Sequence, residues 1–272
     1  MDDRTRTRLV GGAASLLILA VAWNLVAKLA PSTPTRAKPA TPPPSVTRSE
    51  TARPTPAPAP RSGAATQGSD AAASGPGYYD LLARAETRRR IRQSAGVTYL
   101  NEIVAASQDS SLHRWDNRVS EPVRVYLGPD TVANFQPAFL DAVRTAFQRW
   151  GGTGVPVRFT FVSDSLDNAE VRFRWLKKFA TERTGQTDVT WDADGHLQSG
   201  IITIATFDPK GQPLGPDDVR VVALHEIGHL LGLNHSSDST DIMYATGGAR
   251  DLSRRDVQTA LLLYQLVPGS LK

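Results

Sequence analysis

The sequence predicts an α+β domain over residues 112–272, in which a twisted mixed β-sheet is followed by two helices. Three observations support this class. Several short runs alternate apolar and polar residues, as half-buried strands do. A run between the first two of them repeats its apolar residues every three to four positions, as an amphipathic helix does. Two more helical patterns follow the last strand, and a domain of this length buries its own core.

Each strand is expected where the alternation is clearest. These runs are residues 123–127, 157–161, 171–175, 187–191 and 201–205. The last two flank Asp194-Gly195, a dipeptide typical of hairpin turns. Between the first two runs, residues 138–150 form the amphipathic helix, and Gly151-Gly152 ends it.

The two closing helices have recognisable starts. Pro216-Asp217 opens the first one, with Asp217 as the expected N-cap. Ser253 and Asp256 have the spacing of a capping box, so the last helix is expected to begin directly after Ser253.

The N-terminal region contains a long apolar run at residues 9–30, interrupted only by Asn24 and Lys28. It is long enough to cross a bilayer as a transmembrane helix. Arginines precede it, so residues 1–8 are expected in the cytoplasm and the rest of the chain outside it. Length and flanks favour an uncleaved signal anchor, and a cleaved signal peptide that releases a secreted protein is the alternative.

Two segments connect this anchor to the domain. Residues 31–77 hold 11 of the 19 prolines, mixed with Ala, Ser and Thr, and are expected to be a disordered linker. Residues 78–111 are expected to be mostly helical, with an interruption at Gly96. This helical segment either belongs to the domain that follows it or lies outside that domain.

Arg84, Arg88 and Arg92 share one face of that helical segment. A solvated basic face is the favoured interpretation, because most charge runs face water. A contact with anionic lipid, or an inhibitory role as a pro-segment, is the alternative.

Charge and cysteine content exclude several classes. Residues 1–111 carry 14 Lys and Arg against 8 Asp and Glu, whereas residues 112–272 carry 17 against 19. The basic excess therefore lies outside the domain, and no nucleic-acid partner is expected. The chain has no cysteine, which excludes disulfides, thiolate metal sites and a cysteine-based latency switch.

The most informative stretch is HEIGHLLGLNH at residues 225–235. His225 and His229 are four residues apart, so on a helix both rings lie on one face and can approach one metal ion. Gly232 can adopt a left-handed conformation, end the helix and let His235 turn back as a third ligand. Three imidazoles leave a fourth position for water, which is typical of a catalytic Zn²⁺ and not of a structural one.

Glu226 lies one position from His225, where it can approach a metal-bound water without being a ligand. The simpler alternative is a buried helix whose histidines are incidental. Leu224, Ile227 and Leu231 do form an apolar face, but it points away from the histidines, so packing and metal binding do not compete.

These residues resemble the metzincin clan of zinc peptidases, and within it the matrixins, over residues 112–267. Asp241-Ile242-Met243-Tyr244 is similar to the Met-turn, with Met243 beneath the metal. The resemblance implies that Glu226 is the general base of a zinc endopeptidase. It also implies an edge strand that pairs with extended substrate, and residues 203–207 and 189–192 are the two candidates.

The resemblance has limits. Ala245 replaces the proline that often follows the Met-turn tyrosine, so the floor of the specificity pocket is not defined by it. Matrixin relatives often hold structural Ca²⁺, and aspartate oxygens suit that ion. Turn and cap roles are the favoured interpretation of the four candidates, Asp192, Asp194, Asp208 and Asp217. His196 is expected to be a surface histidine and not a ligand of a second zinc ion.

The sequence therefore predicts a monomeric, membrane-anchored zinc endopeptidase with one catalytic zinc, which faces outside the cytoplasm and acts on a protein or peptide substrate. Two alternatives belong to other classes. One is a zinc-bound module that binds partners without catalysis, and the other is a zinc hydrolase of a non-protein amide. The intact Glu226 disfavours the binding module, which needs no base.

Overall fold

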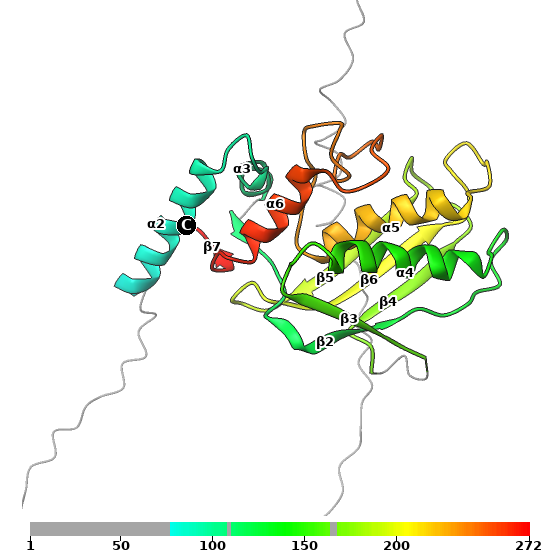
Figure 1. The fold of residues 1–272 in the computed structure, drawn as a ribbon, viewed down its shortest axis with the longest axis horizontal. Coiled ribbons are helices and arrows are strands. Elements are labelled where there is room, and N and C mark those ends of the chain that lie inside the picture. The colour runs from blue at the N-terminus through cyan, green and yellow to red at the C-terminus, as the bar shows by residue number, and fades with distance from the viewer. Residues whose placement is uncertain (1–76, 108–109, 164–167) are drawn as a thin grey trace, which may run out of the picture. The chain divides into compact units, whose positions relative to one another are not determined.

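The structure, a computed structural model, describes residues 77–107, 110–163 and 168–272 (Figure 1). The expected cytoplasmic residues 1–8, the anchor helix 9–30 and the linker up to residue 76 lie outside these ranges, so these three assignments stay predictions. Among the described residues, no helix combines the length and the apolar character that crossing a membrane requires.

The core of the fold is a five-stranded mixed sheet with the order β3-β2-β4-β6-β5. Its strands are β2 (Arg118–Tyr126), β3 (Val157–Val162), β4 (Val171–Leu176), β5 (Gly185–Trp191) and β6 (Leu197–Ala205). Neighbouring strands are parallel except β5, which pairs antiparallel with β6. All five expected strands are present, so the predicted α+β class with a mixed sheet is confirmed.

Two helices lie side by side across one face of this sheet, α4 (Ala138–Gly151) and α5 (Pro216–Leu230) (Figure 1). The apolar face of α4 is buried, as its periodicity predicted, and each large side chain in such a core contributes about 1.5–3 kcal/mol. Trp150 of α4 donates from Nε1 to the backbone oxygen of Leu224 at 2.9 Å. This bond fixes α5, the helix that carries the histidine motif, against α4.

The starts of the closing helices differ in how well they were predicted. In α6 (Arg254–Leu263), Ser253 Oγ accepts from the Asp256 backbone N–H, so the capping box is confirmed. In α5 the N-cap is Gly215, and the expectation for Asp217 is wrong. Proline favours the first helical position, so Pro216 places the cap at Gly215, two residues before the expected one. Asp217 lies in the first turn and pairs with Arg220 and Arg250.

The segment before the domain forms two helices, α2 (Tyr78–Gln93) and α3 (Leu100–Ala106). Gly96 lies between them with φ +82°, which agrees with the predicted interruption. Tyr99 and Leu100 are fully buried in the same core as the sheet and α5. The segment therefore belongs to the folded domain, which resolves the question that the sequence left open.

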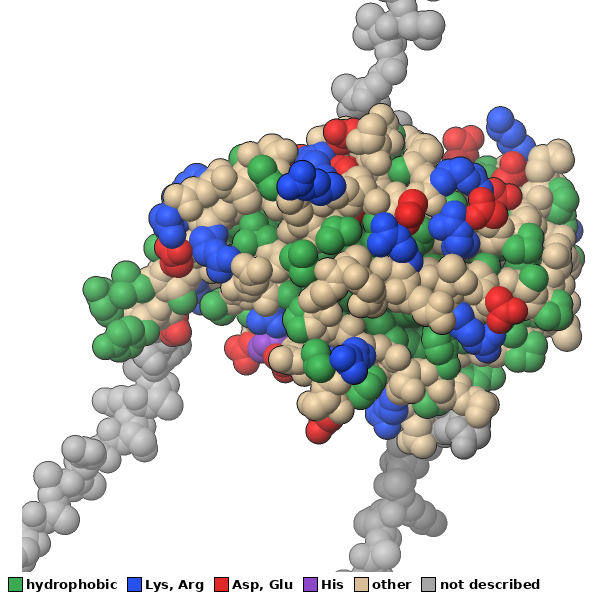
Figure 2. All heavy atoms as spheres, viewed as in Figure 1, with side chains coloured by type: hydrophobic (Ala, Val, Ile, Leu, Met, Phe, Trp, Pro, Cys, Tyr) green, Lys and Arg blue, Asp and Glu red, His purple; other side chains and the backbone are tan. Residues whose placement is uncertain are grey.

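The C-terminal end of the chain lies beside α2. The short strands β1 (Ser111–Leu112) and β7 (Gly269–Ser270) pair antiparallel. Arg84 and Arg88 donate to the backbone oxygens of Lys272 and Leu271, respectively. Of the three arginines predicted to form a solvated face, only Arg92 is exposed to solvent. The exposed apolar side chains at the start of α2 include Tyr79, which is 82% exposed (Figure 2).

Candidate active site

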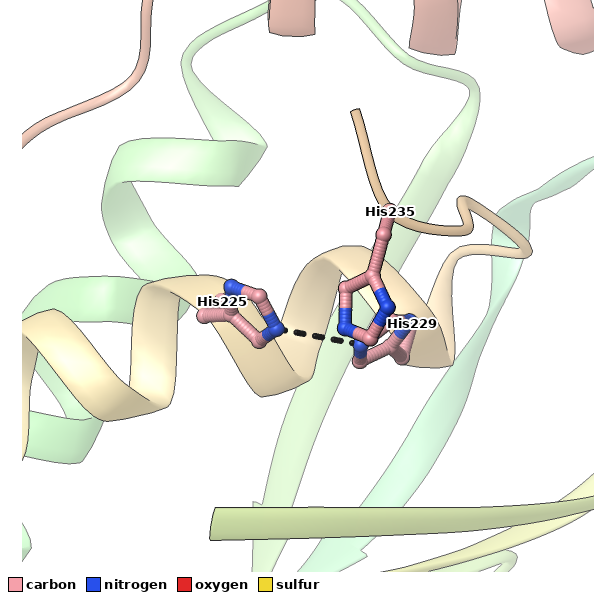
Figure 3. A group of neighbouring side chains, drawn as sticks. All are labelled: His225, His229 and His235. Carbon is pink, nitrogen blue, oxygen red and sulfur yellow. Dashed lines mark hydrogen bonds between the residues drawn. The ribbon is translucent and has the colours of Figure 1, made fainter. Parts of the chain in front are cut away.

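Helix α5 and the loop after it bring the three predicted histidines together (Figure 3). His225 and His229 are one turn apart on α5, and their Nε2 atoms are 3.1 Å from each other. His235 reaches the same place from the loop, and one ring nitrogen of each histidine lies within 4.8 Å of the others. Ligands at about 2.0–2.1 Å from a tetrahedral zinc ion are about 3.3 Å apart, which the 3.1 Å between Nε2 of His225 and His229 matches.

Hydrogen bonds to backbone oxygens select which ring nitrogen is free. Nδ1 of His225 is 2.7 Å from the oxygen of Ile242, and Nδ1 of His229 is 2.9 Å from that of Leu233. A carbonyl oxygen only accepts, so both Nδ1 atoms carry the proton and both Nε2 lone pairs are available to a metal. Burial lowers the pKa of all three histidines, and that of His235 to about 4, which keeps them neutral at pH 7.

Gly232 forms the turn between the helix and His235. Its φ is +95°, and a Cβ there would overlap the backbone oxygen of His113. The left-handed conformation and the close approach both exclude a side chain at this position. The glycine therefore ends the helix as the motif predicted. The backbone that passes next to it is that of His113, a residue for which the sequence predicted no role.

Glu226 is buried, with 5% of its surface exposed, beside the edge strand β5. Thr187 of β5 donates from Oγ1 to Glu226 Oε2 at 2.7 Å. Gly185 leaves room for the carboxylate, because a Cβ there would overlap Oε1. Burial raises the pKa of Glu226 to about 7, although the Thr187 hydrogen bond acts in the opposite direction. Such a carboxylate exchanges protons readily near neutral pH.

The fully buried Met243 lies against α5 at Gly228, between the first two histidines. A Cβ on Gly228 would overlap the Met243 sulfur, so this glycine lets the methionine pack directly against the helix backbone. Gly228, Gly185 and Thr187 were not predicted as site residues. Of the three, only Gly228 lies inside the HExxH stretch, and this position was the signal that could have identified it.

The other candidate residues lie in separate places. His196 pairs with Asp116 at 3.1 Å and lies near Asp192 at 3.6 Å. Asp192 accepts from the backbone N–H groups of Asp194 and His196, and Asp208 accepts from that of Gln212. Within the described residues, the three histidines of the motif are the one cluster of His and acidic side chains suited to a metal. Calcium binding at the aspartates stays a hypothesis.

Of the two candidate edge strands, residues 203–207 are excluded, because β6 lies between β4 and β5. Strand β5, which contains residues 189–191, is the edge of the sheet and is packed beside α5. The edge strand and the three histidines thus adjoin the same helix.

The family model for matrixin peptidases matches residues 126–265, more than half of the chain. The chain belongs to the matrixin family. This family is one of zinc-dependent metallopeptidases, and the match includes the three histidines, Glu226 and Met243. Helices α2 and α3 lie outside the matched residues.

Curated matrixin relatives are similar over parts of the chain. Metalloendoproteinase 1 of Glycine max is 36% identical over 48% of this chain and 47% of its own length. Probable matrix metalloproteinase 095L of Invertebrate iridescent virus 3 is 38% identical over 29% of this chain and 27% of its own. Matrilysin of Felis catus is 52% identical over 19% and 16%. The chain spans less than half the length of each of these relatives.

Proposed function

We propose that this matrixin is a zinc-dependent endopeptidase, in which His225, His229 and His235 hold one zinc ion and Glu226 is the general base. When bound, the ion would polarise the peptide carbonyl and acidify the attacking water. One observation carries the proposal. The buried carboxylate of Glu226 follows His225 directly in sequence, on the helix that also carries two of the three imidazoles that converge.

Glu226 would take a proton from the attacking water and return it to the leaving amine. A base is most effective when its pKa is close to the working pH, and burial raises that of Glu226 to about 7. The hydrogen bond from Thr187 holds Oε2 of the carboxylate, and Oε1 lies against Gly185, so β5 fixes the carboxylate through both oxygens. Both groups are fixed on regular elements, so the geometry is set before substrate arrives.

The free edge of β5 would bind an extended substrate. Among the residues that the structure describes, β5 pairs on one side only, with β6, so its other backbone N–H and C=O groups can form ladder bonds with a peptide. Main-chain pairing is independent of side chains, which suits a protein or peptide substrate.

We further propose a monomer anchored through residues 9–30, with its domain outside the cytoplasm; secretion after cleavage of that segment is the alternative.

The test is the cleavage of an unfolded protein by the full-length chain, run beside Glu226→Ala at equal zinc content. Cleavage by the wild type alone is expected, because Glu226 is a base and not a ligand. Equal cleavage by both proteins would overturn the role of Glu226. Zinc binding without cleavage by either protein would favour the binding module, and hydrolysis confined to cell-wall amides would favour the zinc hydrolase of a non-protein amide.

A further inference from the structure

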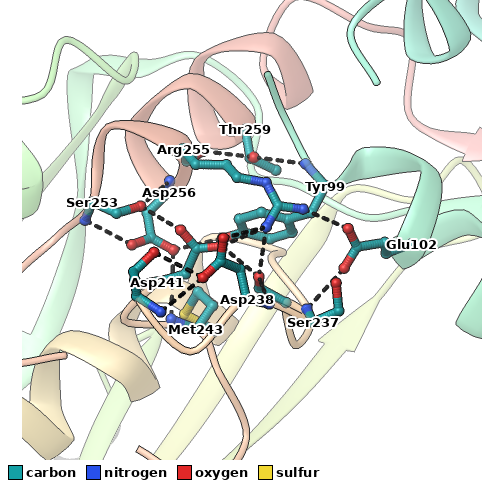
Figure 4. A network of polar contacts seen from close by, with 12 residues as sticks. Tyr99, Glu102, Ser237, Asp238, Asp241, Met243, Ser253, Arg255, Asp256 and Thr259 are labelled. Carbon is teal, nitrogen blue, oxygen red and sulfur yellow. Dashed lines mark hydrogen bonds and ion pairs between the residues drawn. The ribbon is translucent and has the colours of Figure 1, made fainter. Parts of the chain in front are cut away.

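Two side chains at the start of α3 hydrogen-bond to the segment that follows His235, one to its loop and the other to α6 (Figure 4). They are Tyr99 and Glu102, and both lie outside the part of the chain that matches the matrixin family. We call residues 78–106, which form α2 and α3, the N-terminal brace. It contacts the metal-site region through two separate sets of hydrogen bonds.

The first set runs from Tyr99 to His225. The Tyr99 hydroxyl donates to Asp256 Oδ1 at 3.0 Å, and Asp256 Oδ2 accepts from the Ile242 backbone N–H at 2.9 Å. The oxygen of the same Ile242 is the acceptor for His225 Nδ1 at 2.7 Å. Tyr99 and Asp256 are both fully buried, so no water competes for these bonds.

The second set holds the chain just after His235. Glu102 Oε2 accepts from the Ser237 backbone N–H at 2.8 Å. Its other oxygen pairs with Arg255 at 2.5 Å, and Arg255 also donates to the buried Asp241 at 2.8 Å. Glu102 thus fixes a backbone group two residues from a histidine and orients the arginine that neutralises Asp241.

These contacts matter because His235 lies in a loop. The rings of His225 and His229 are held by hydrogen bonds and by α5, whereas His235 depends on the path of the backbone around it. Charge-assisted bonds to a backbone N–H are among the stronger contacts in proteins. Loss of the Glu102 carboxylate would leave the Ser237 N–H without its acceptor and the loop free to shift.

We propose that Tyr99 and Glu102 are positioning residues of the metal site, through which the N-terminal brace supports zinc binding. This inference rests on the proposed zinc site. It assigns a role to a segment that the family match does not include.

The experiment compares zinc affinity in full-length wild type, Tyr99→Phe, Glu102→Gln and Glu102→Ala by competition with a chelator of known affinity. Mutation of groups that orient metal ligands typically costs about 10–100-fold, and we expect about tenfold for Glu102→Ala and Tyr99→Phe. Glu102→Gln keeps an oxygen acceptor for Ser237, so its loss should be smaller. The visible spectrum of the cobalt-substituted proteins reports ligand geometry and should change in the same order.

Glu86→Gln is the matched control, because Glu86 forms a solvent-exposed ion pair with Arg89 on α2 of the same brace. It should bind zinc like the wild type. Lower thermal stability with wild-type zinc affinity and cobalt spectra in all variants would overturn the positioning role and leave a purely structural one. Failure of the wild type itself to bind one zinc ion would instead overturn the proposed function.

Discussion

Substitution of Gly232 by alanine tests the turn that returns His235 to the site. Gly232 has φ +95°, and a left-handed conformation costs a residue with a Cβ about 1–2 kcal/mol. The new Cβ would also overlap the backbone oxygen of His113, and forced repacking of this kind costs about 1–3 kcal/mol. The free energy of unfolding should therefore fall by about 2–5 kcal/mol. That is a large share of the ~5–15 kcal/mol typical of a domain.

Urea unfolding of the metal-free full-length proteins, followed by tryptophan fluorescence, measures this loss without a contribution from zinc. Gly211→Ala is the matched control. Gly211 has φ +84°, but a Cβ there would meet nothing within 4 Å, so its variant carries the conformational cost alone. The difference between the two variants isolates the overlap with His113.

The two results that refute the reasoning are distinct. Equal losses in both variants would show that the His113 segment moves aside at no cost, and the close-approach argument would be wrong. A Gly232→Ala protein as stable as the wild type would contradict the conformational argument as well. With zinc added, the variant should also bind the ion more weakly, because a shifted turn displaces His235.

Three further predictions concern the same site. Gly228→Ala should lower the free energy of unfolding by about 1–3 kcal/mol in denaturant titrations, because its Cβ overlaps the Met243 sulfur; an unchanged midpoint would contradict this packing. Zinc should stay bound at pH 6 and be lost toward pH 4 in dialysis with metal analysis, because burial lowers the pKa of the histidines, that of His235 to about 4. Thr187→Val removes a hydrogen bond that lowers the pKa of Glu226, so the acidic limb of kcat/KM should move to higher pH; a shift to lower pH would exclude Glu226 as the titrating base.

Much of the fold followed from local patterns. The five strands of the sheet and the helices α4, α5 and α6 were predicted because side-chain periodicity is a property of neighbouring residues, whereas the two-residue strands β1 and β7 are too short to show it. The order of the strands was not, because pairing joins segments far apart in the sequence. Periodicity alone could not distinguish the buried strand β6 from the edge strand β5, and only the observed order resolves the two candidates.

The candidate site, like the fold, was predictable only where its residues are close together in the sequence. The three histidines and Glu226 lie within eleven residues, so helix geometry and the turn at Gly232 were enough to place them near one point. Thr187, which holds Glu226, is 39 residues away in sequence, and Tyr99 is 157 residues from Asp256. A half-buried threonine in a strand or a buried tyrosine beside a helix carries no local signal of its partner, so these contacts required the structure.

The comparison of the three histidines explains why the site needs support from outside the motif. A helix fixes the backbone of His225 and His229, and each ring is hydrogen-bonded at Nδ1. For His235, within the described part of the chain, the structure gives a hydrogen bond only through its backbone N–H, which donates to Oδ1 of Asn234. Its position therefore depends on Gly232 before it and on Ser237 after it, which Glu102 holds. A tetrahedral ion tolerates little error in ligand position, so the two anchors that flank His235 should set the zinc affinity of the whole site.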